Sequence, residues 1–263
     1  MKSHKSLVSI IMPAYNCEEF VHESISSIIH QTYSNWELII VNDFSRDNTL
    51  NICNKYASND PRISVFENTI QKGAAFSRNF ATELASGEYI SFLDSDDIWK
   101  ADKIEKQLNF MTSNNYDFTY TFYDIFQSNI NQTTLIKSPK KINKFNMLFS
   151  NPIGCLTVMY NRRSLGKIYS PLFKKRNDYS LWIEILNKSI YGYCLDISLA
   201  SYRKSDKSLS SGKIENIIYY WKIIKNYFSF WYFLALISTP IYLFLLFLKK
   251  KIPNLYNKLI RIS

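Results

Sequence analysis

The chain has 263 residues and a formal net charge of +10 at pH 7, with 46% hydrophobic and 21% charged residues. This length allows one large domain or one domain with an appendage, and the composition excludes an intrinsically disordered chain. The basic charge favours an anionic partner, namely nucleic acid, a phosphorylated ligand or an anionic membrane. The N-terminus lacks a signal-peptide pattern and the four cysteines are widely spaced, so we expect a cytosolic chain with reduced thiols.

Short apolar runs alternate with segments of helical periodicity in the first third of the chain. The apolar runs predict strands at residues 8–12, 37–41, 63–66 and 89–93, and the periodic segments predict helices at 19–30, 47–57 and 73–85. This alternation indicates a parallel sheet with right-handed crossovers. Ligands bind such sheets beyond the carboxyl ends of the strands, so a site is expected there.

The rest of the chain is less regular. We expect a helix at 100–111, an aromatic strand at 116–126, a polar loop at 129–143, a strand at 154–160 and a helix at 178–187. Residues 213–227 form a basic amphipathic stretch, and residues 228–248 carry no charge before three consecutive lysines. The change in composition places a domain boundary at residue 212.

Polar clusters follow three of the predicted strands. They are Pro13-Ala14-Tyr15-Asn16 after the first strand, Asn42-Asp43 with Ser45 and Asp47 after the second, and Asp94-Ser95-Asp96-Asp97 after the fourth. Asn-Asp-x-Ser is also ordinary turn and helix-cap chemistry, and a solvated acidic turn is the alternative for the third cluster. Three carboxylates within four residues repel one another unless a cation lies among them. Magnesium and similar hard cations prefer such oxygen ligands.

Residues 8–99 resemble the N-terminal half of a family 2 glycosyltransferase. The matching segments are VSIIMPAYN, the strand ending in VND, KGAAFSRN and GEYISFLDSDD, which occur in the family's order. The resemblance implies an α/β GT-A fold, with a Rossmann-like, mostly parallel sheet flanked by helices, over residues 1–212. It implies an inverting, metal-dependent enzyme that transfers a sugar from a nucleotide sugar such as a UDP-sugar. Surface polysaccharide assembly on a lipid-linked or saccharide acceptor is the expected setting.

The resemblance also assigns roles to individual residues. Asp96 is the expected ligand of Mn²⁺ or Mg²⁺, and Asp178, in the segment Asn177-Asp178-Tyr179-Ser180-Leu181-Trp182, is the expected base. Spacing places Asp178 on the face of Leu181 and Trp182, although Asp is also common where a helix begins. Arg78 is expected at the donor, with a surface position as the alternative. The expected donor-binding residues are Pro13, Ala14, Tyr15, Asn16, Asp43, Lys72, Arg78, Asp94 and Ser95.

Two departures from the family pattern matter. The segment Tyr202-Arg203-Lys204-Ser205 lacks the histidine that often occurs in the family, so a third metal ligand from the protein is not expected. The chain also lacks a Q-x-x-R-W segment, which processive members carry. We therefore expect the transfer of one sugar per encounter.

Three other classes of protein are less favoured. A Rossmann-type oxidoreductase would need a G-x-G-x-x-G loop, which the six glycines do not provide. A nucleic-acid-binding protein could explain the charge, but the basic residues gather after residue 100 and flank the apolar tail, so we expect no nucleic acid partner. A catalytically inactive relative that binds nucleotide sugars remains the alternative function.

The apolar stretch 228–248 is long enough to cross a bilayer. A single crossing would separate basic clusters that both prefer the cytoplasmic side, and Pro240 can bend or break a helix. We therefore expect a bent or re-entrant element at the inner leaflet of the cytoplasmic membrane, with a single span as the runner-up. A buried core helix is the remaining alternative.

Overall fold

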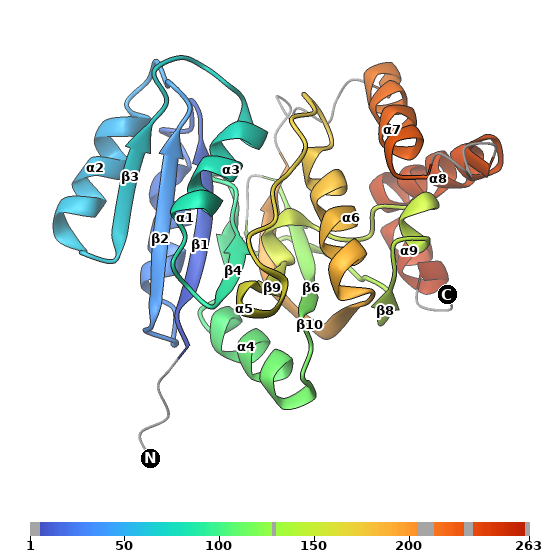
Figure 1. Cartoon of the computed structure of the whole chain (residues 1–263), viewed down its shortest axis with the longest axis horizontal. Coiled ribbons are helices and arrows are strands. Elements are labelled where there is room, and N and C mark those ends of the chain that lie inside the picture. Colours follow the sequence, from blue (N-terminus) through green and yellow to red (C-terminus); the bar gives the residue numbers. More distant parts are fainter. Residues whose placement is uncertain (1–5, 128–129, 205–212, 229–233, 261–263) are drawn as a thin grey trace.

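The computed structural model describes residues 6–127, 130–204, 213–228 and 234–260. One mixed sheet forms its centre, and helices cover both faces of the sheet (Figure 1). The strands are β1 (Val8–Ala14), β2 (Trp36–Asn42), β3 (Ile63–Glu67), β4 (Tyr89–Phe92), β5 (Ile98–Trp99), β6 (Phe118–Phe126), β7 (Thr134–Ile136), β8 (Lys141–Ile142), β9 (Met159–Asn161) and β10 (Gly192–Arg203). The helices are α1 (Val21–Ile29), α2 (Thr49–Asn59), α3 (Ala74–Leu84), α4 (Lys103–Asn114), α5 (Arg162–Leu165), α6 (Asn177–Ser189), α7 (Lys213–Tyr227), α8 (Leu234–Lys251) and α9 (Pro253–Ile260), with 3₁₀ turns η1 (Asn146–Leu148) and η2 (Cys155–Thr157).

The strand order is β3-β2-β1-β4-β9-β6-β10-β5, with β7 paired to β6 and β8 paired to β10. Strands β1 to β4 are parallel, as the alternation of strands and helices predicts. Strand β9 is antiparallel to both β4 and β6, and β10 runs parallel to β6. The expectation of a mostly parallel sheet therefore holds for the first half, and the whole sheet is mixed.

Alternate side chains of the central strands enter two separate cores. Ile11 and Ile39 belong to the core beneath α3 and α6, whereas Ile10 and Leu38 belong to the core beneath α1, α2 and α4. This pattern follows from the two-residue repeat of a strand, which sends successive side chains to opposite faces. Because both faces are covered, the strands read as continuous apolar runs in the sequence.

Two predictions for the second half were wrong, and one strand was not predicted. The expected polar loop at 129–143 contains β7 and β8, which have only three and two residues and are too short to show a strand pattern. The expected strand at 154–160 is divided between η2 and β9. Strand β10, which has 12 residues and pairs with β6, was not recognised, because its pairing shifts register between Leu195 and Ser198 and between Ser198 and Ser201. Such irregularities interrupt the two-residue alternation by which a strand is recognised.

The C-terminal helices α7, α8 and α9 lie at the end of the molecule opposite α2 and β3 (Figure 1). Helix α8 continues through Pro240, and the expected bent or re-entrant membrane element stays a prediction. One side of α8 is packed inward, with Tyr242 and Leu248 buried in the two cores. Among the described residues, no helix is both long enough and apolar enough to cross a membrane.

Candidate active site

The loops after β1 and β2 are joined by hydrogen bonds between their own polar groups. The Asn16 backbone N–H donates to Ser45 Oγ at 3.0 Å, and the Arg46 N–H donates to the Asn16 side-chain oxygen at 2.8 Å. Ser45 in turn donates to Asn42 at 2.6 Å. Asn16 has a φ of 44°, a left-handed conformation that asparagine tolerates better than most residues. The turn-forming residues thus build a fixed rim beyond the carboxyl ends of these two strands.

Asp43 is buried and holds the loop that leads into α3. Its carboxylate accepts hydrogen bonds from the Asn68 amide at 2.7 Å and from the backbone N–H groups of Lys72 and Gly73, both at 2.8 Å. A carboxylate offers about four acceptor positions, so about one remains for a ligand. Gly73 begins α3 with a φ of 89°, which favours glycine. Asp43 therefore shapes the donor-side loop, and its contact with a nucleotide base stays a prediction.

The other predicted donor residues differ in their accessibility. Pro13 and Ala14 are buried within β1, where they pair with Val41 and Asn42. Tyr15 is 43% exposed and Lys72 is also exposed, with its ammonium group 4.2 Å from the centre of the Phe76 ring. Asn16 is exposed as well, whereas Ser95 is buried and its carbonyl accepts a hydrogen bond from Ser24 of α1 at 2.9 Å. Tyr15, Asn16 and Lys72 are thus the members of this set whose side chains a donor can reach.

The acidic segment after β4 forms a turn that is held by the end of β10. The Asp97 N–H donates to the Asp94 carbonyl at 3.1 Å, which closes the turn. Arg203 donates through its backbone N–H to the Asp97 carboxylate at 2.9 Å and through its side chain to the Asp96 carbonyl at 3.0 Å. The Arg203 guanidinium also pairs with Glu23. Arg203 lies in the segment that lacks the family's histidine, and here it fixes the acidic turn.

Asp96 lies in the middle of this acidic turn, and its role as a metal ligand stays a prediction. Burial and the neighbouring Asp94 charge raise the pKa of Asp96 to about 6. Within the described residues Asp96 has no salt-bridge partner, and no group of three or more His, Cys, Asp or Glu side chains has metal-binding geometry. A divalent cation held by one or two carboxylates and completed by diphosphate oxygens fits this arrangement. Asp97 is fully buried, and the same neighbouring carboxylates, together with its burial, raise its pKa.

Arg78 connects the acidic turn to the helix that carries the predicted base. It is 3% exposed, so the alternative of a surface position is excluded. Its two terminal nitrogens donate to Asp94 at 2.8 Å and to the Asn177 side chain at 2.7 Å. Both terminal nitrogens are therefore bound to protein acceptors, which indicates a positioning role. Contact between Arg78 and a donor phosphate stays a prediction.

Asp178 lies in the first turn of α6, next to Asn177. Asn151 donates a hydrogen bond to its carboxylate at 3.4 Å, and the side chain is partly exposed. Leu181 and Trp182, which spacing placed on the same face, are buried in the core. The acidic turn and the start of α6, far apart in the sequence, are thus brought together through Arg78. A carboxylate at this position can accept a proton from a ligand beside the acidic turn.

Sequence reasoning missed three residues of this site. Asn177 has no predicted role beside Asp178, yet it accepts the hydrogen bond from Arg78. Asn151 falls in an irregular segment that carries no motif, and Arg203 was noted only for the histidine missing beside it. Their roles depend on contacts across 99, 27 and 106 residues of sequence, respectively, which no local pattern reveals.

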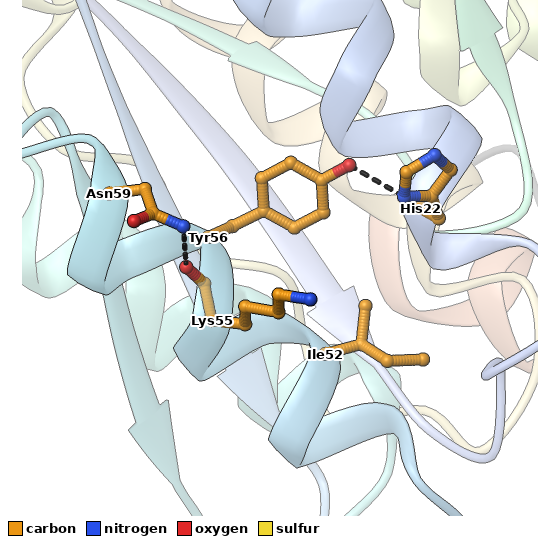
Figure 2. Close-up of a pocket in the computed structure, with 5 residues that line it drawn as sticks. All are labelled: His22, Ile52, Lys55, Tyr56 and Asn59. Atoms are coloured by element: carbon orange, nitrogen blue, oxygen red, sulfur yellow. Dashed lines mark hydrogen bonds between the residues drawn. The ribbon is translucent and has the colours of Figure 1, made fainter.

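A pocket of about 450 Å³ lies apart from these residues, between α1 and α2 (Figure 2). It is lined by His22, Ile52, Lys55, Tyr56 and Asn59. The Tyr56 hydroxyl and His22 Nδ1 are hydrogen bonded at 2.6 Å across it. None of the residues predicted for the site lines this pocket, and it offers no carboxylate for proton transfer or metal binding.

Comparison with known proteins identifies the family of this chain. Residues 9–168 match the model of Glycosyl transferase family 2. The chain is 38% identical over 227 residues to the putative teichuronic acid biosynthesis glycosyltransferase TuaG of Bacillus subtilis, covering 86% of this chain and 87% of that protein. It is 40% identical over 222 residues to an Escherichia coli UDP-Glc:alpha-D-GlcNAc-diphosphoundecaprenol beta-1,3-glucosyltransferase, WfgD, covering 84% and 86% of the two chains.

Solved structures show the same fold at lower identity. TarS of S. aureus in complex with UDP-GlcNAc has a TM-score of 0.68 and 22% identity, covering 85% of this chain and 67% of that chain. A mannosyltransferase from Pyrobaculum calidifontis in complex with GDP-Man and Mn²⁺ has a TM-score of 0.66 and 16% identity, covering 85% and 64%. With more than half of the chain matched by the family model and the sheet arranged as described, the chain belongs to glycosyl transferase family 2 and has the GT-A fold.

Proposed function

We propose that the protein is an inverting, metal-dependent glycosyltransferase that moves one sugar from a UDP-sugar to a lipid-linked saccharide during surface polysaccharide synthesis. The observation that carries the proposal is the Asp94–Arg78–Asn177 connection, because it joins the acidic turn to the start of α6 in one site. Two relatives support the setting, since the name of one refers to teichuronic acid and the name of the other to a diphosphoundecaprenol acceptor.

The donor occupies the loops after β1, β2 and β4 in this proposal. Tyr15 and Lys72 are exposed at the rim and reach the nucleotide, and Asp43 keeps the loop before α3 in place. Asp96 would hold a Mn²⁺ or Mg²⁺ ion, whose positive charge would stabilise the negative charge of the leaving diphosphate. Asp94 keeps its position through Arg78 and would assist in holding the ion or the ribose.

Asp178 acts as the general base. Its carboxylate takes the proton from the acceptor hydroxyl as that oxygen forms a bond to the anomeric carbon, and the bond from this carbon to the diphosphate breaks. The hydroxyl oxygen attacks from the side opposite the leaving group, so the configuration is inverted. Asn151 and the Arg78–Asn177 link keep the Asp178 segment in place without adding a competing acid.

We further propose that the C-terminal helices hold the enzyme at the cytoplasmic side of the cell membrane. Ile237, Ile241, Phe244 and Phe247 are exposed along one side of α8, although its other side is packed inward. The sequence after Glu215 contains no acidic residue and several lysines, which favours contact with anionic headgroups. An apolar helix face bordered by basic residues is typical of a helix that lies in the membrane interface.

The proposal is tested by assaying the purified protein with a panel of nucleotide sugars and a saccharide-diphosphate-lipid acceptor. We expect transfer from one donor in the presence of Mn²⁺, and a β-linked product from an α-linked donor, measured from the anomeric coupling by NMR. Retention of configuration would refute the inverting class. If donor binds but is neither transferred nor hydrolysed with Mn²⁺, the chain is an inactive relative.

A further inference from the structure

Helix α8 contacts residues on both sides of the proposed base, Asp178. The Tyr242 hydroxyl accepts a hydrogen bond from the guanidinium of Arg176, which is two residues before Asp178. The Lys249 ammonium donates to the Asn151 carbonyl at 3.2 Å, and the Asn151 side chain donates to Asp178 at 3.4 Å. Tyr242 and Lys249 are seven residues apart, so they share one face of α8 about 10 Å apart along its axis. This face of α8 therefore frames the start of α6.

A stack of aromatic rings fixes α8 in this position. The Tyr242 ring is stacked on Tyr220 of α7 with 4.3 Å between the ring centres, and Tyr220 is stacked on Tyr179 of α6 at 6.4 Å. The Tyr220 hydroxyl is also hydrogen bonded to the Leu148 carbonyl at 2.7 Å and to Ser238 of α8 at 2.8 Å. All three tyrosines are buried, so α8 is part of the wall beside the site.

Arg176 and Lys249 carry positive charges that no carboxylate compensates directly. Within the part of the chain that the structure describes, neither residue forms a salt bridge, whereas Arg78 is paired with Asp94. The Nε atom of Arg176 is buried and has no hydrogen-bond partner there. Burial lowers the pKa of Arg176, against the opposing effect of the Asp178 charge. The guanidinium of Arg176 therefore keeps hydrogen-bonding capacity that the described residues do not use.

The backbone of Arg176 is also unusual. Its φ of 57° and ψ of 31° place it in the left-handed region, which residues with a Cβ rarely adopt. Such conformations gather at ligand-binding and active sites, where the surrounding structure maintains them. Here the hydrogen bond to Tyr242 and the start of α6 hold Arg176 beside Asp178.

We propose that Arg176 and Lys249 bind the phosphate groups of a lipid-diphosphate acceptor, so that α8 supplies part of the acceptor site. The inference rests on the proposed function. In such an acceptor the diphosphate is attached to the sugar whose hydroxyl must reach Asp178, so its negative charges lie about one sugar ring from the base. Arginine and lysine are the side chains that bind phosphate oxygens. The apolar outer side of α8 suits the hydrocarbon chain that continues from the diphosphate.

The phosphate groups bound here could instead belong to the nucleotide donor or to an anionic membrane lipid. Two acceptors separate these sources, in detergent solution without a bilayer. Both carry the sugar that the wild-type enzyme uses best; one joins it to a short alkyl chain through a diphosphate, and the other joins it directly to the same chain. The variants are Lys249→Gln, Arg176→Lys and the control Lys251→Gln, which changes an exposed lysine on the other side of α8.

We expect Lys249→Gln to raise the KM for the diphosphate acceptor about tenfold, which corresponds to about 1.4 kcal/mol of binding. Activity on the phosphate-free acceptor and KM for the donor should not change. Arg176→Lys keeps the charge but loses the paired donors of the guanidinium. It should therefore also raise the KM for the diphosphate acceptor and leave activity on the phosphate-free acceptor unchanged. Lys251→Gln should match the wild type on both acceptors.

Equal losses on both acceptors would show that Lys249 and Arg176 act only through the structure around Asp178, and would overturn the inference. A raised KM for the donor would show that Arg176 and Lys249 bind the phosphates of the nucleotide donor. A loss that occurs only when anionic vesicles are added would assign it to membrane lipid. If the wild type transfers sugar to neither acceptor, the proposed function fails, which is a different outcome from unchanged kinetics in an active Lys249→Gln variant.

Discussion

The two sides of the site are built in different ways. On the donor side, the loops after β1 and β2 are held by hydrogen bonds between polar groups of nearby loops, such as those of Asn16, Ser45 and Asp43. On the acceptor side, Asp178 accepts a hydrogen bond from Asn151. Its neighbour Asn177 is bound by α3, and the Asn151 carbonyl is bound by the C-terminal helix α8. The donor side is therefore a local and largely self-contained structure. The acceptor side depends on the packing of the second half of the chain, which is where substrate selection is expected to reside.

Replacing the proposed metal ligand should have the largest effect, because it should impair both turnover and donor binding. We expect Asp96→Ala to reduce kcat/KM by about a thousandfold or more, because a metal ion contributes several kcal/mol of charge stabilisation. Donor binding should weaken at the same time, and EDTA should have the same effect on the wild type. The measurements are initial rates and donor affinity by calorimetry with and without Mn²⁺. Full activity in EDTA would contradict the metal assignment.

Replacing the proposed base should lower the rate of transfer to the acceptor and leave donor binding unchanged. Asp178→Asn retains the shape of the side chain but removes its basicity, so kcat should fall by about 10²- to 10⁴-fold. Donor affinity should stay close to that of the wild type, because Asp178 lies on the acceptor side. Single-turnover rates and donor titrations measure the two effects separately. A variant that retains more than about a tenth of the wild-type kcat, well outside that range, would point to another base.

Arg78 joins the two sides, so its replacement tests whether they act together. Arg78→Lys keeps a positive charge but cannot donate to Asp94 and Asn177 at once. The loss of one hydrogen bond to a charged group costs about 1.5–3 kcal/mol, which corresponds to about a 10- to 150-fold lower kcat/KM.

A matched control for Arg78→Lys is Arg62→Lys, which changes a partly exposed arginine that pairs with Asp60 away from the site. It should have little effect on either rate or donor affinity, since exposed ion pairs contribute little. If Arg78→Lys alters only donor affinity and leaves single-turnover rates unchanged, the link to α6 has no role in the reaction.

The same difference explains how much of the molecule could be predicted from the sequence. The strands β1 to β4 are apolar runs that alternate with helices and mostly end in polar clusters, so both their parallel arrangement and the convergence of the clusters follow from the sequence. Asp94 and Asp178 were recognised because each lies in a family motif. Asn151 and Lys249 lie in no motif, and the contact of each depends on how the chain folds back over the sheet. Local patterns do not specify such long-range contacts.

The smallest effect is expected from replacing Glu37. This residue lies in β2, in the donor-side half of the sheet, but near the amino-terminal ends of the strands. Its carboxylate accepts hydrogen bonds from Ser9 at 2.6 Å, from the N–H and hydroxyl groups of Ser86, both at 2.8 Å, and from the Gly87 N–H at 3.1 Å. Burial acts to raise the pKa of Glu37, but these hydrogen bonds outweigh it and hold the pKa below its usual value of 4.5. Glu37→Gln should therefore lower the free energy of unfolding by about 1 kcal/mol at pH 7, since it exchanges charged for neutral hydrogen bonds.

The pH dependence of this loss follows from the direction of the shift. Because the pKa of Glu37 is lower in the folded than in the unfolded chain, its contribution is complete above about pH 4.5 and disappears as pH falls through the folded-state value. Thermal unfolding of the wild type and of Glu37→Gln should thus differ by about 2–4 °C at pH 7 and converge below pH 4.5. Catalytic rates should remain equal at 25 °C, because the donor-side loops are fixed by their own hydrogen bonds. A difference in Tm that persists unchanged at low pH would mean that the shape of the side chain, and not its charge, stabilises this end of the sheet.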